Sequence, residues 1–253
     1  MSSTPRFFVP PEAIVGDTVT LPPDDAHHAR SVVRLRVGEA VLVHDGCDRV
    51  YRGTLTEVTA RAVTARVEPP TAAGTEPAMR LTVAQALPKT TEKIEQVLQH
   101  GTEIGAAGFV MWGAARSVAK LGANDKVNRR LDRWRGIVKG AAEQSGRGVL
   151  PDVHWATNAR DIADRVRDFD AALVTHEAAT ESLADVLARL PREAARLLVI
   201  VGPEGGLTDD EVARFAGAGA SPVSLGPRVL RTETAALVAL AQILFARDGA
   251  APL

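Results

Sequence analysis

The alternation of apolar and polar positions changes its period along the chain and divides the chain into two parts. Over residues 1–68, short β-branched segments alternate apolar and polar residues with a period of two, and turn residues such as Asp45-Gly46 separate them. This pattern is typical of half-buried strands. With one short helix that begins near Asp24, it predicts a small β-barrel. The strands are expected at residues 6–9, 18–21, 40–44, 50–58 and 62–67.

Residues 68–79 have neither period and are rich in proline, alanine, threonine and glycine, which indicates a linker. From residue 80 onward, short apolar runs alternate with longer helical segments. Such alternation is typical of a mostly parallel sheet covered by helices on both faces. The predicted fold class is therefore α/β, with a barrel at residues 1–70, a linker at 71–79 and an α/β domain at 80–253. Within that domain we expect strands at 81–86, 109–112, 153–155, 171–175, 197–201 and 222–225, and helices at 91–103, 124–144, 159–166, 182–190, 209–216 and 233–245.

Two glycine-containing turns follow predicted strands near the C-terminus. In the first, residues 202–206 read Gly-Pro-Glu-Gly-Gly, and Thr208 is then the expected N-cap of a helix. In the second, a Gly226-Pro227 turn precedes a helix with Thr232 as its expected N-cap. A short turn between strand and helix is where open α/β sheets bind ligands, and glycine lets the backbone approach a ligand closely.

A Gly-Pro turn can also do no more than end a strand. The ionisable residues in these turns, Glu204 in the first and Arg231 and Glu233 at the second, favour a binding site instead. The spacing matches neither the dinucleotide-binding fingerprint nor the P-loop.

Composition narrows the class of protein. The 45% hydrophobic and 24% charged residues are ordinary for a soluble globular chain, and no apolar run approaches eighteen residues, so we expect a cytoplasmic protein. The single cysteine, Cys47, excludes a disulfide framework and a cysteine-rich metal site. His27 and His28 are adjacent on the predicted helix and so point in different directions, and we expect no metal.

Charge is distributed unevenly. The net charge of −1 argues against a general nucleic-acid coat protein, yet residues 116–150 hold nine Lys or Arg against three acids, a local charge of +6. Such a run is either a solvated helix face or a surface that follows RNA phosphates. An aromatic fraction of 4% argues against a base-stacking platform. The residues proposed for RNA binding are Arg6, Arg30, Arg34, Arg36, Arg116, Lys120, Arg133, Gln144 and Arg147.

Several segments together resemble one known family. VGPEGGLTDDE (residues 201–211) and LGPRVLRTETAAL (225–237) are similar to the defining segments of the ribosomal RNA small-subunit methyltransferase E family, which belongs to the SPOUT class. HHARSVVRLRVGE, QALPK and AAEQSGR also match in the same order, so the resemblance covers nearly the whole chain. Leu207 departs from the pattern, since an aromatic residue is common there.

The resemblance implies an N-terminal PUA-like β-barrel that binds RNA and a C-terminal SPOUT-type α/β domain with a trefoil knot. It also implies a homodimer that uses S-adenosyl-L-methionine, releases S-adenosyl-L-homocysteine and methylates N3 of one uridine in 16S rRNA of the small ribosomal subunit. The knot follows only from the resemblance, because true knots are otherwise very rare. The implied cofactor-binding residues are Thr175, His176, Glu177, Gly202, Pro203, Glu204, Gly205, Gly206, Leu225, Gly226, Leu230, Arg231, Thr234 and Ala235.

Methylation of a uridine at N3 requires removal of the N3 proton. Arg231 is our candidate for stabilising the uracil anion, and Glu233 or Glu143 for proton handling or orientation. Glu233 could instead serve only the helix dipole, and Arg231 could form a salt bridge to Glu233 or Glu204.

Two other functions remain open from the sequence. A methyltransferase of the same class acting on another RNA or base would share these motifs. A non-catalytic RNA-binding protein of ribosome assembly would explain the basic segment but would leave both glycine turns without a task.

Overall fold

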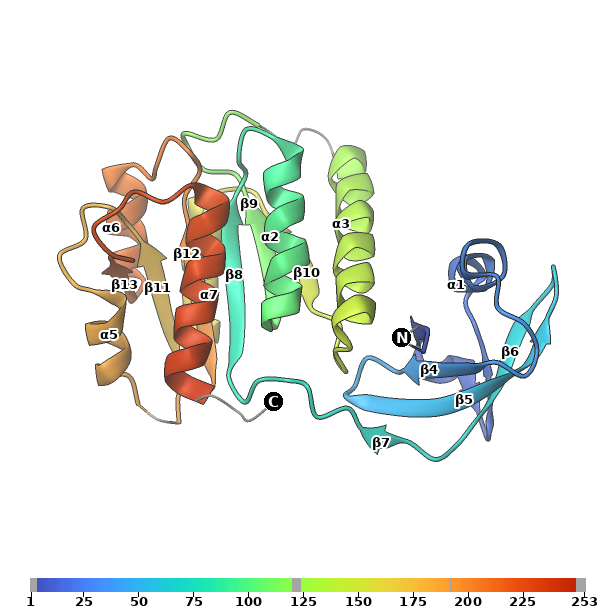
Figure 1. Cartoon of the computed structure of the whole chain (residues 1–253). Helices are drawn as coiled ribbons and strands as arrows, with labels where there is room; N and C mark the ends of the chain where they lie inside the picture. Colours follow the sequence, from blue (N-terminus) through green and yellow to red (C-terminus); the bar gives the residue numbers. More distant parts are fainter. Residues whose placement is uncertain (1–3, 120–123, 192, 249–253) are drawn as a thin grey trace. The chain divides into compact units, whose positions relative to one another are not determined.

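The computed structural model describes residues 4–119, 124–191 and 193–248 (Figure 1). It divides into two compact units. The N-terminal unit comprises Met1–Glu76 and Ala142–Leu150, and the C-terminal unit comprises Pro77–Ala141 and Pro151–Leu253. Lys120, one of the residues proposed for RNA binding, lies outside the described residues.

The N-terminal unit is built on a seven-stranded sheet in the order β1-β4-β5-β6-β3-β2, with β7 paired to β5. All its pairs are antiparallel except β1 with β4. Alternate residues of the strands point inward and form one apolar core that includes Phe7, Val43 and Leu55. The strands are β1 (Arg6–Phe8), β2 (Ile14–Val15), β3 (Thr18–Thr20), β4 (Ala40–His44), β5 (Arg49–Val58), β6 (Val63–Val67) and β7 (Thr71–Ala72).

The structure corrects the sequence prediction for this unit in three places. The two-residue strands β2 and β7 were not predicted, because two residues show no period, and β7 falls within the predicted linker. The predicted helix begins at Pro23 rather than near an Asp24 cap, as α1 (Pro23–His27), and continues as the π-helix η2 (His28–Val33). It ends at Arg34, whose left-handed φ of 62° is uncommon for a residue other than glycine.

The segment at residues 142–150 completes the N-terminal unit although it follows β7 by some 70 residues of sequence. Glu143 Oε1 accepts a hydrogen bond from the peptide N–H of Phe8 at 3.3 Å. Arg147, only 4% exposed, forms an ion pair with Glu76. Val149 forms a β-bridge with Cys47. These contacts fasten the segment along the sheet at the β1 and β7 ends.

The C-terminal unit contains a six-stranded sheet in the order β10-β9-β8-β12-β11-β13, with every pair parallel. Its central strands are almost entirely buried, as expected for a parallel sheet covered on both faces. The strands are β8 (Arg80–Ala86), β9 (Gly108–Trp112), β10 (Asp152–Ala156), β11 (Ala171–Thr175), β12 (Arg196–Val201) and β13 (Ala220–Val223).

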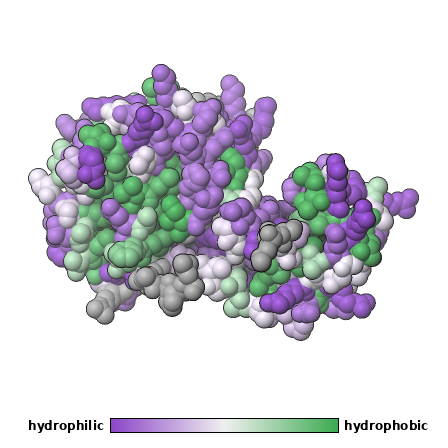
Figure 2. Space-filling view, viewed as in Figure 1, coloured by the Kyte–Doolittle hydropathy of each residue, from purple (hydrophilic) through white to green (hydrophobic). Residues whose placement is uncertain are grey.

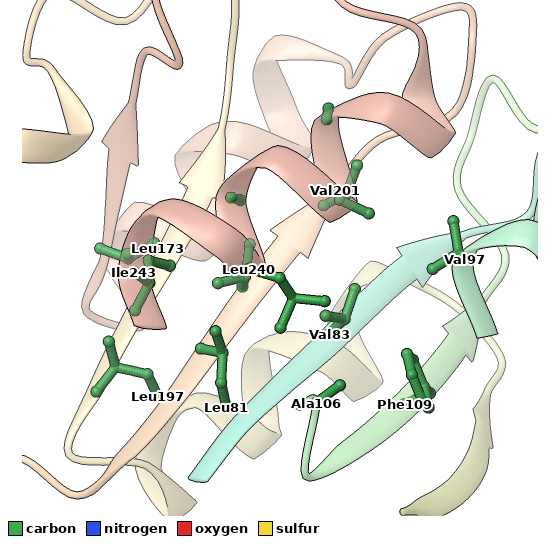
Figure 3. Packing of buried hydrophobic residues seen from close by; sticks show 14 of the residues in the cluster. Leu81, Val83, Val97, Ala106, Phe109, Leu173, Leu197, Val201, Leu240 and Ile243 are labelled. Carbon is green, nitrogen blue, oxygen red and sulfur yellow. The ribbon is translucent and has the colours of Figure 1, made fainter. Parts of the chain in front are cut away.

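Helices cover both faces of this sheet. Residues of α2, α3, α5 and α7 share one apolar cluster, and α4 and α6 pack in a second cluster on the opposite face. In the first cluster, Leu240 and Ile243 of α7 lie over Leu81 and Leu197 of the two central strands (Figure 3). The helices are α2 (Thr91–Ile104), α3 (Asn124–Ser145), α4 (Ala159–Arg165), α5 (Leu183–Arg189), α6 (Asp209–Gly217) and α7 (Thr232–Asp248).

The strand order reverses its direction at the middle of the sheet, between β8 and β12. The chain runs outward from β8 to β9 and β10, then crosses to β11 and returns to insert β12 between β11 and β8. The neighbours β8 and β12 are followed by α2 and α6, which cover opposite faces. This is the topological switch point at which open α/β sheets bind ligands.

The α/β class and the two-part architecture are thus confirmed, and the trefoil knot stays a prediction. The strand predicted at residues 222–225 actually occupies Ala220–Val223. Pro222 lies inside this strand and not at its start, because it pairs with Val174 in an edge strand, where proline is tolerated. No helix in the described part of the chain is long and apolar enough to cross a membrane.

His44 yields a test of the N-terminal core. It is 3% exposed, lies 5.2 Å from the ring of Phe8, and finds no hydrogen-bond partner for either ring nitrogen among the described residues. Burial and then the charge of Arg6 lower its pKa, against the opposing effect of Asp45 and Asp48. The folded unit therefore holds the neutral ring, whereas the unfolded chain takes up a proton near pH 6.5.

The free energy of unfolding should consequently fall as the pH drops below about 6.5, by at most about 1.4 kcal/mol per pH unit for this one proton. We expect His44→Leu to flatten this dependence. Urea titrations between pH 5 and 8, followed through amide NMR signals of β4 and β5, measure it. An equally steep pH dependence in the variant would contradict the assignment to His44.

Candidate functional site

The segments predicted to bind a cofactor all leave the C-terminal edge of the parallel sheet. Residues 175–177 end β11 and follow it, residues 202–206 follow β12, and residues 225–235 connect β13 to α7. Because β12, β11 and β13 are neighbours in the sheet, these three segments lie along one edge, next to the end of β8.

The loop after β12 requires the glycines that the sequence places there. A side chain at Gly202 would come within 2.9 Å of Leu207, and Gly206 has a φ of +71°. Gly206 also donates its peptide N–H to the carbonyl of Pro203 at 2.9 Å, which closes a tight turn. Gly206 is therefore required by its backbone conformation and Gly202 by the close approach of Leu207, whatever the loop binds.

The far end of this loop is fixed by the predicted helix cap. Thr208 and Glu211 form a complete capping box, so the predicted N-cap is confirmed. The other carboxylate oxygen of Glu211 accepts the peptide N–H of Ala115 at 2.8 Å. Arg116 donates from Nη1 to the carbonyls of Gly205 and Leu207, at 3.0 and 3.2 Å. Arg116 was proposed for RNA, and here its guanidinium holds the loop.

The near end of the loop is tied to two other elements through Thr232. Its hydroxyl donates to the carbonyl of Gly202 at 2.5 Å and accepts from Gln85 Nε2 at 2.8 Å. Thr232 is 6% exposed and Gln85 is fully buried. The prediction that Thr232 is an N-cap is wrong, because α7 begins at Thr232 and the hydroxyl bonds other segments. The sequence comparison included Gln85 in the QALPK segment, but it predicted no role for this residue.

Lys93 of α2 joins the two acidic residues of the site. Its Nζ lies 2.8 Å from Glu204 Oε1 and 3.5 Å from Glu233 Oε2. Glu204 also accepts the peptide N–H of Lys89 at 3.0 Å. Partial burial would raise the pKa of Glu204, but the hydrogen bonds from Lys93 and from peptide N–H groups outweigh it, so that pKa lies below its usual value. The hydrogen bond to Glu204 raises the pKa of Lys93.

Arg231 and Glu233 differ sharply in their surroundings. Arg231 is exposed and forms no ion pair with any described residue, so the alternative of a salt bridge to Glu204 or Glu233 is not observed. Glu233 lies in the first turn of α7, is 8% exposed and faces Lys93. Sequence reasoning missed Lys93 as the partner, since nothing in residue spacing places α2 beside α7.

The loop after β13 combines apolar side chains with free backbone donors. Leu225 and Leu230 are half-buried against the apolar cluster, and Gly226 has a φ of +118°. Within the described chain, the peptide N–H groups of Leu230 and Arg231 have no hydrogen-bond acceptor. An apolar surface beside unpaired peptide donors suits a flat heteroaromatic ring with polar edges. Thr234 is exposed, and Ala235 is buried with its N–H on the carbonyl of Arg231.

The segment after β11 gives less specific evidence of a ligand. Thr175 Oγ1 donates to the carbonyl of Ile200 at 3.3 Å, and His176 donates its peptide N–H to Val223 at 3.0 Å. Both are half-buried, and Glu177 is exposed. These bonds tie the segment to the neighbouring strands and leave its side chains at the edge of the sheet.

The residues proposed for RNA binding fall into two groups. Arg34, Arg36 and Gln144 are exposed, and Arg30 is half-buried with one nitrogen on the carbonyl of Thr59 at 2.9 Å. The others already hold protein groups: Arg6 the carbonyl of Glu143, Arg133 the carboxylate of Glu95, and Arg147 that of Glu76. Buried Arg147 acts as a structural ion pair here.

An open pocket of about 410 Å³ lies on the α4 and α6 side of the C-terminal unit, beyond the ends of β9 and β10. It is lined in part by Arg160, Glu211 and Arg214 and contains none of the predicted site residues. No group of three or more His, Cys, Asp or Glu within the described ranges is placed to hold a metal ion.

Comparison with known families agrees with this fold. Residues 75–244 match the family described as the RNA methyltransferase domain, and residues 21–68 match the RNA methyltransferase PUA domain. The two matches define the class of protein as an RNA methyltransferase with a PUA domain.

Relatives identify the family within that class. The ribosomal RNA small subunit methyltransferase E of Mycobacterium bovis is 39% identical over 94% of this chain and 90% of its own length. The protein of the same name from Bacillus subtilis is 34% identical over 90% of each chain. The chain belongs to the ribosomal RNA small subunit methyltransferase E family.

Solved structures share the whole architecture. The ribosomal RNA small subunit methyltransferase E from Neisseria gonorrhoeae, bound to S-adenosyl methionine, has a TM-score of 0.85 and 28% identity, over 95% of this chain and 97% of its own. A Legionella pneumophila protein in complex with the cofactor SAM has a TM-score of 0.87 and 30% identity, over 97% and 98%.

The Thr232 hydroxyl predicts a measurable difference between two substitutions. Thr232→Val keeps the shape but leaves the Gly202 carbonyl and the Gln85 amide without their partner, which should lower the free energy of unfolding by about 1–3 kcal/mol. Thr232→Ser keeps the hydroxyl and should cost clearly less. Urea unfolding of both variants measures the difference, and equal stabilities would show that the hydroxyl is not the important group.

Proposed function

We propose that this protein transfers a methyl group from S-adenosyl-L-methionine to N3 of a specific uridine in 16S rRNA of the small ribosomal subunit. The observation that carries the proposal is the convergence of the three loops at the switch point of an RNA methyltransferase domain. The names of the relatives support rRNA of the small subunit as the substrate, and the cofactor in the related solved structures supports S-adenosyl-L-methionine. The N3 position rests on the resemblance and on the charges in the site.

The residues at the sheet edge fit this cofactor. Leu225 and Leu230 offer an apolar surface for the adenine ring, and the unpaired peptide N–H of Leu230 can donate to a ring nitrogen. The turn of residues 202–206 allows close approach of a ligand to the backbone. When bound, S-adenosyl-L-methionine supplies an activated methyl group on a sulfonium, so no metal is needed for the transfer.

The protein then has to position the uracil ring and favour its anion. Arg231 is suited to the second task, because its guanidinium is exposed and unpaired in the described structure and can donate to a uracil carbonyl oxygen as negative charge develops. Either Glu233 or Glu143 is the carboxylate that we assign to orientation or proton handling.

RNA contacts are proposed on each unit separately. The N-terminal unit carries three arginines on or just after the π-helix, namely Arg30, Arg34 and Arg36. Arg34 and Arg36 are exposed, and Arg30 is half-buried. On the C-terminal unit, α3 carries exposed Arg129 and Arg135. Such cations contribute sequence-independent affinity for phosphates, which weakens as salt concentration rises.

A homodimer is proposed from the composition of α7. This helix is apolar on nearly all sides, and Phe245 is 73% exposed. Figure 2 shows hydrophobic residues gathered on the face where α7 lies. A helix that is hydrophobic all round is normally buried, so we infer that a second copy of the chain covers α7.

Methyl transfer can be tested with S-adenosyl-L-methionine that carries a labelled methyl group. The protein is incubated with small ribosomal subunits lacking the modification, and separately with protein-free rRNA and with tRNA, and mass spectrometry identifies the nucleoside. We expect labelled N3-methyluridine from 16S rRNA. Label in another nucleoside would contradict the base, and binding of the cofactor without any label would favour a non-catalytic role in ribosome assembly.

Arg231→Ala should lower the rate of methyl transfer by about 10²-fold, as loss of one group that stabilises a developing anion does. Arg228→Ala is the matched control, because Arg228 is an exposed arginine of the same loop with no assigned role. A wild-type rate in Arg231→Ala, with unchanged cofactor affinity, would remove Arg231 from the mechanism.

The dimer is tested by sedimentation of the full chain at micromolar concentration. We expect a species of twice the 26.8 kDa monomer, and Phe245→Glu should shift it toward the monomer because a charge would be buried in the interface. A wild-type monomer under these conditions would contradict the proposal.

A further inference from the structure

We propose that Lys93 is a positioning residue for cofactor binding, which latches the glycine turn after β12 to the start of α7 by holding Glu204 and Glu233 together. The proposal rests on the cofactor site proposed above. It assigns a function to a residue of α2 that lies outside the three cofactor loops.

The latch consists of one ammonium group and two carboxylates from three segments. Nζ of Lys93 is 2.8 Å from Glu204 in the turn and 3.5 Å from Glu233 in α7. Glu204 is further held by the peptide N–H of Lys89 at the start of the β8–α2 connection. The turn is therefore joined to α2 and, through Lys93, to α7.

A second tie lies two residues earlier in the same turn. The carbonyl of Gly202 accepts the hydroxyl of Thr232, the residue just before Glu233. The turn is thus fastened at position 202 directly to α7, and at position 204 through Lys93. Thr232 and Glu233 of α7 thus hold positions 202 and 204 of the turn, the second through Lys93. Because two positions are held, the peptide groups between them are fixed in both place and direction.

The ion pair can order the turn after β12 without contributing much to the stability of the whole C-terminal unit. The Lys93 and Glu204 side chains are 25% and 33% exposed, and an ion pair at that exposure contributes little to the stability of a whole domain. None of the three charged residues belongs to the apolar cluster of this face. Loss of the pair should therefore loosen the turn locally and leave the unit folded.

The latch also decides between the two roles left open for Glu233. Its carboxylate is 11% exposed and faces an ammonium that already binds Glu204. The Glu233 carboxylate thereby orients Lys93 and, through it, Glu204. We therefore assign Glu233 to positioning.

The test compares Lys93→Met with wild type by two measurements that need no catalysis. Calorimetry gives the affinity for S-adenosyl-L-methionine, and hydrogen exchange of the cofactor-free protein gives the protection of residues 203–207. We expect affinity to fall by about tenfold and exchange of the turn to rise, with the melting temperature almost unchanged. Lys126→Met, the same substitution at an exposed lysine of α3, is the matched control and should alter none of the three.

Two further variants assign the effect to the ion pair. Glu204→Gln should weaken binding to a similar degree, and adding it to Lys93→Met should cost little more, because both remove one interaction. Lys93→Arg keeps the positive charge and should restore most of the affinity.

The proposal is overturned if Lys93→Met leaves either the affinity or the exchange of the turn unchanged, or if it lowers the melting temperature of the whole protein. Failure of the wild-type protein to bind S-adenosyl-L-methionine would instead overturn the proposed function. Additive losses in the double variant would show that Lys93 and Glu204 act separately, which also contradicts the latch.

Discussion

A single hydroxyl group connects three elements at the edge of the sheet that carries the candidate site. Thr232 Oγ1 joins the end of β8, the turn after β12 and the first residue of α7, through Gln85 and Gly202. Gln85 lies more than a hundred residues before the other two residues, Gly202 lies 30 residues before Thr232, and the parallel sheet alone fixes only where the strands end. The hydroxyl can donate once and accept once in this environment, and both capacities are used between buried groups.

The distribution of polar groups in the C-terminal unit follows from the sheet. Strands β8 and β12 are buried on both faces, so polar side chains can gather only where these strands end. There the fold has collected Gln85, Thr232, Lys93 and the two glutamates on the face covered by α2 and α7. The apolar cluster on this face is continuous and stabilises the unit. The polar network at the edge of the sheet is therefore free to adopt a geometry that suits ligand binding.

Much of this arrangement could be predicted from local pattern. The apolar run that forms β12, the capping box at Thr208 and the glycine at position 206 each depend on a few adjacent residues, and each was predicted. What failed depends on distant partners or on very short elements. The Thr232 side chain was assigned to its own helix because the acceptor at Gly202 is invisible in sequence. Lys93 was overlooked because a lysine on an amphipathic helix usually faces solvent, and β7 because two residues show no period.

The attachment of residues 142–150 to the N-terminal unit has a consequence for biosynthesis. Buried Arg147 pairs with Glu76, and Glu143 caps the backbone at Phe8, so strands that are made first depend on contacts that are made much later. During translation the chain emerges from its N-terminus onward, and the barrel must wait for roughly half of the polypeptide before its set of contacts is complete. The last contacts of the N-terminal unit can therefore form only after β8, α2 and β9 of the C-terminal unit have been synthesised.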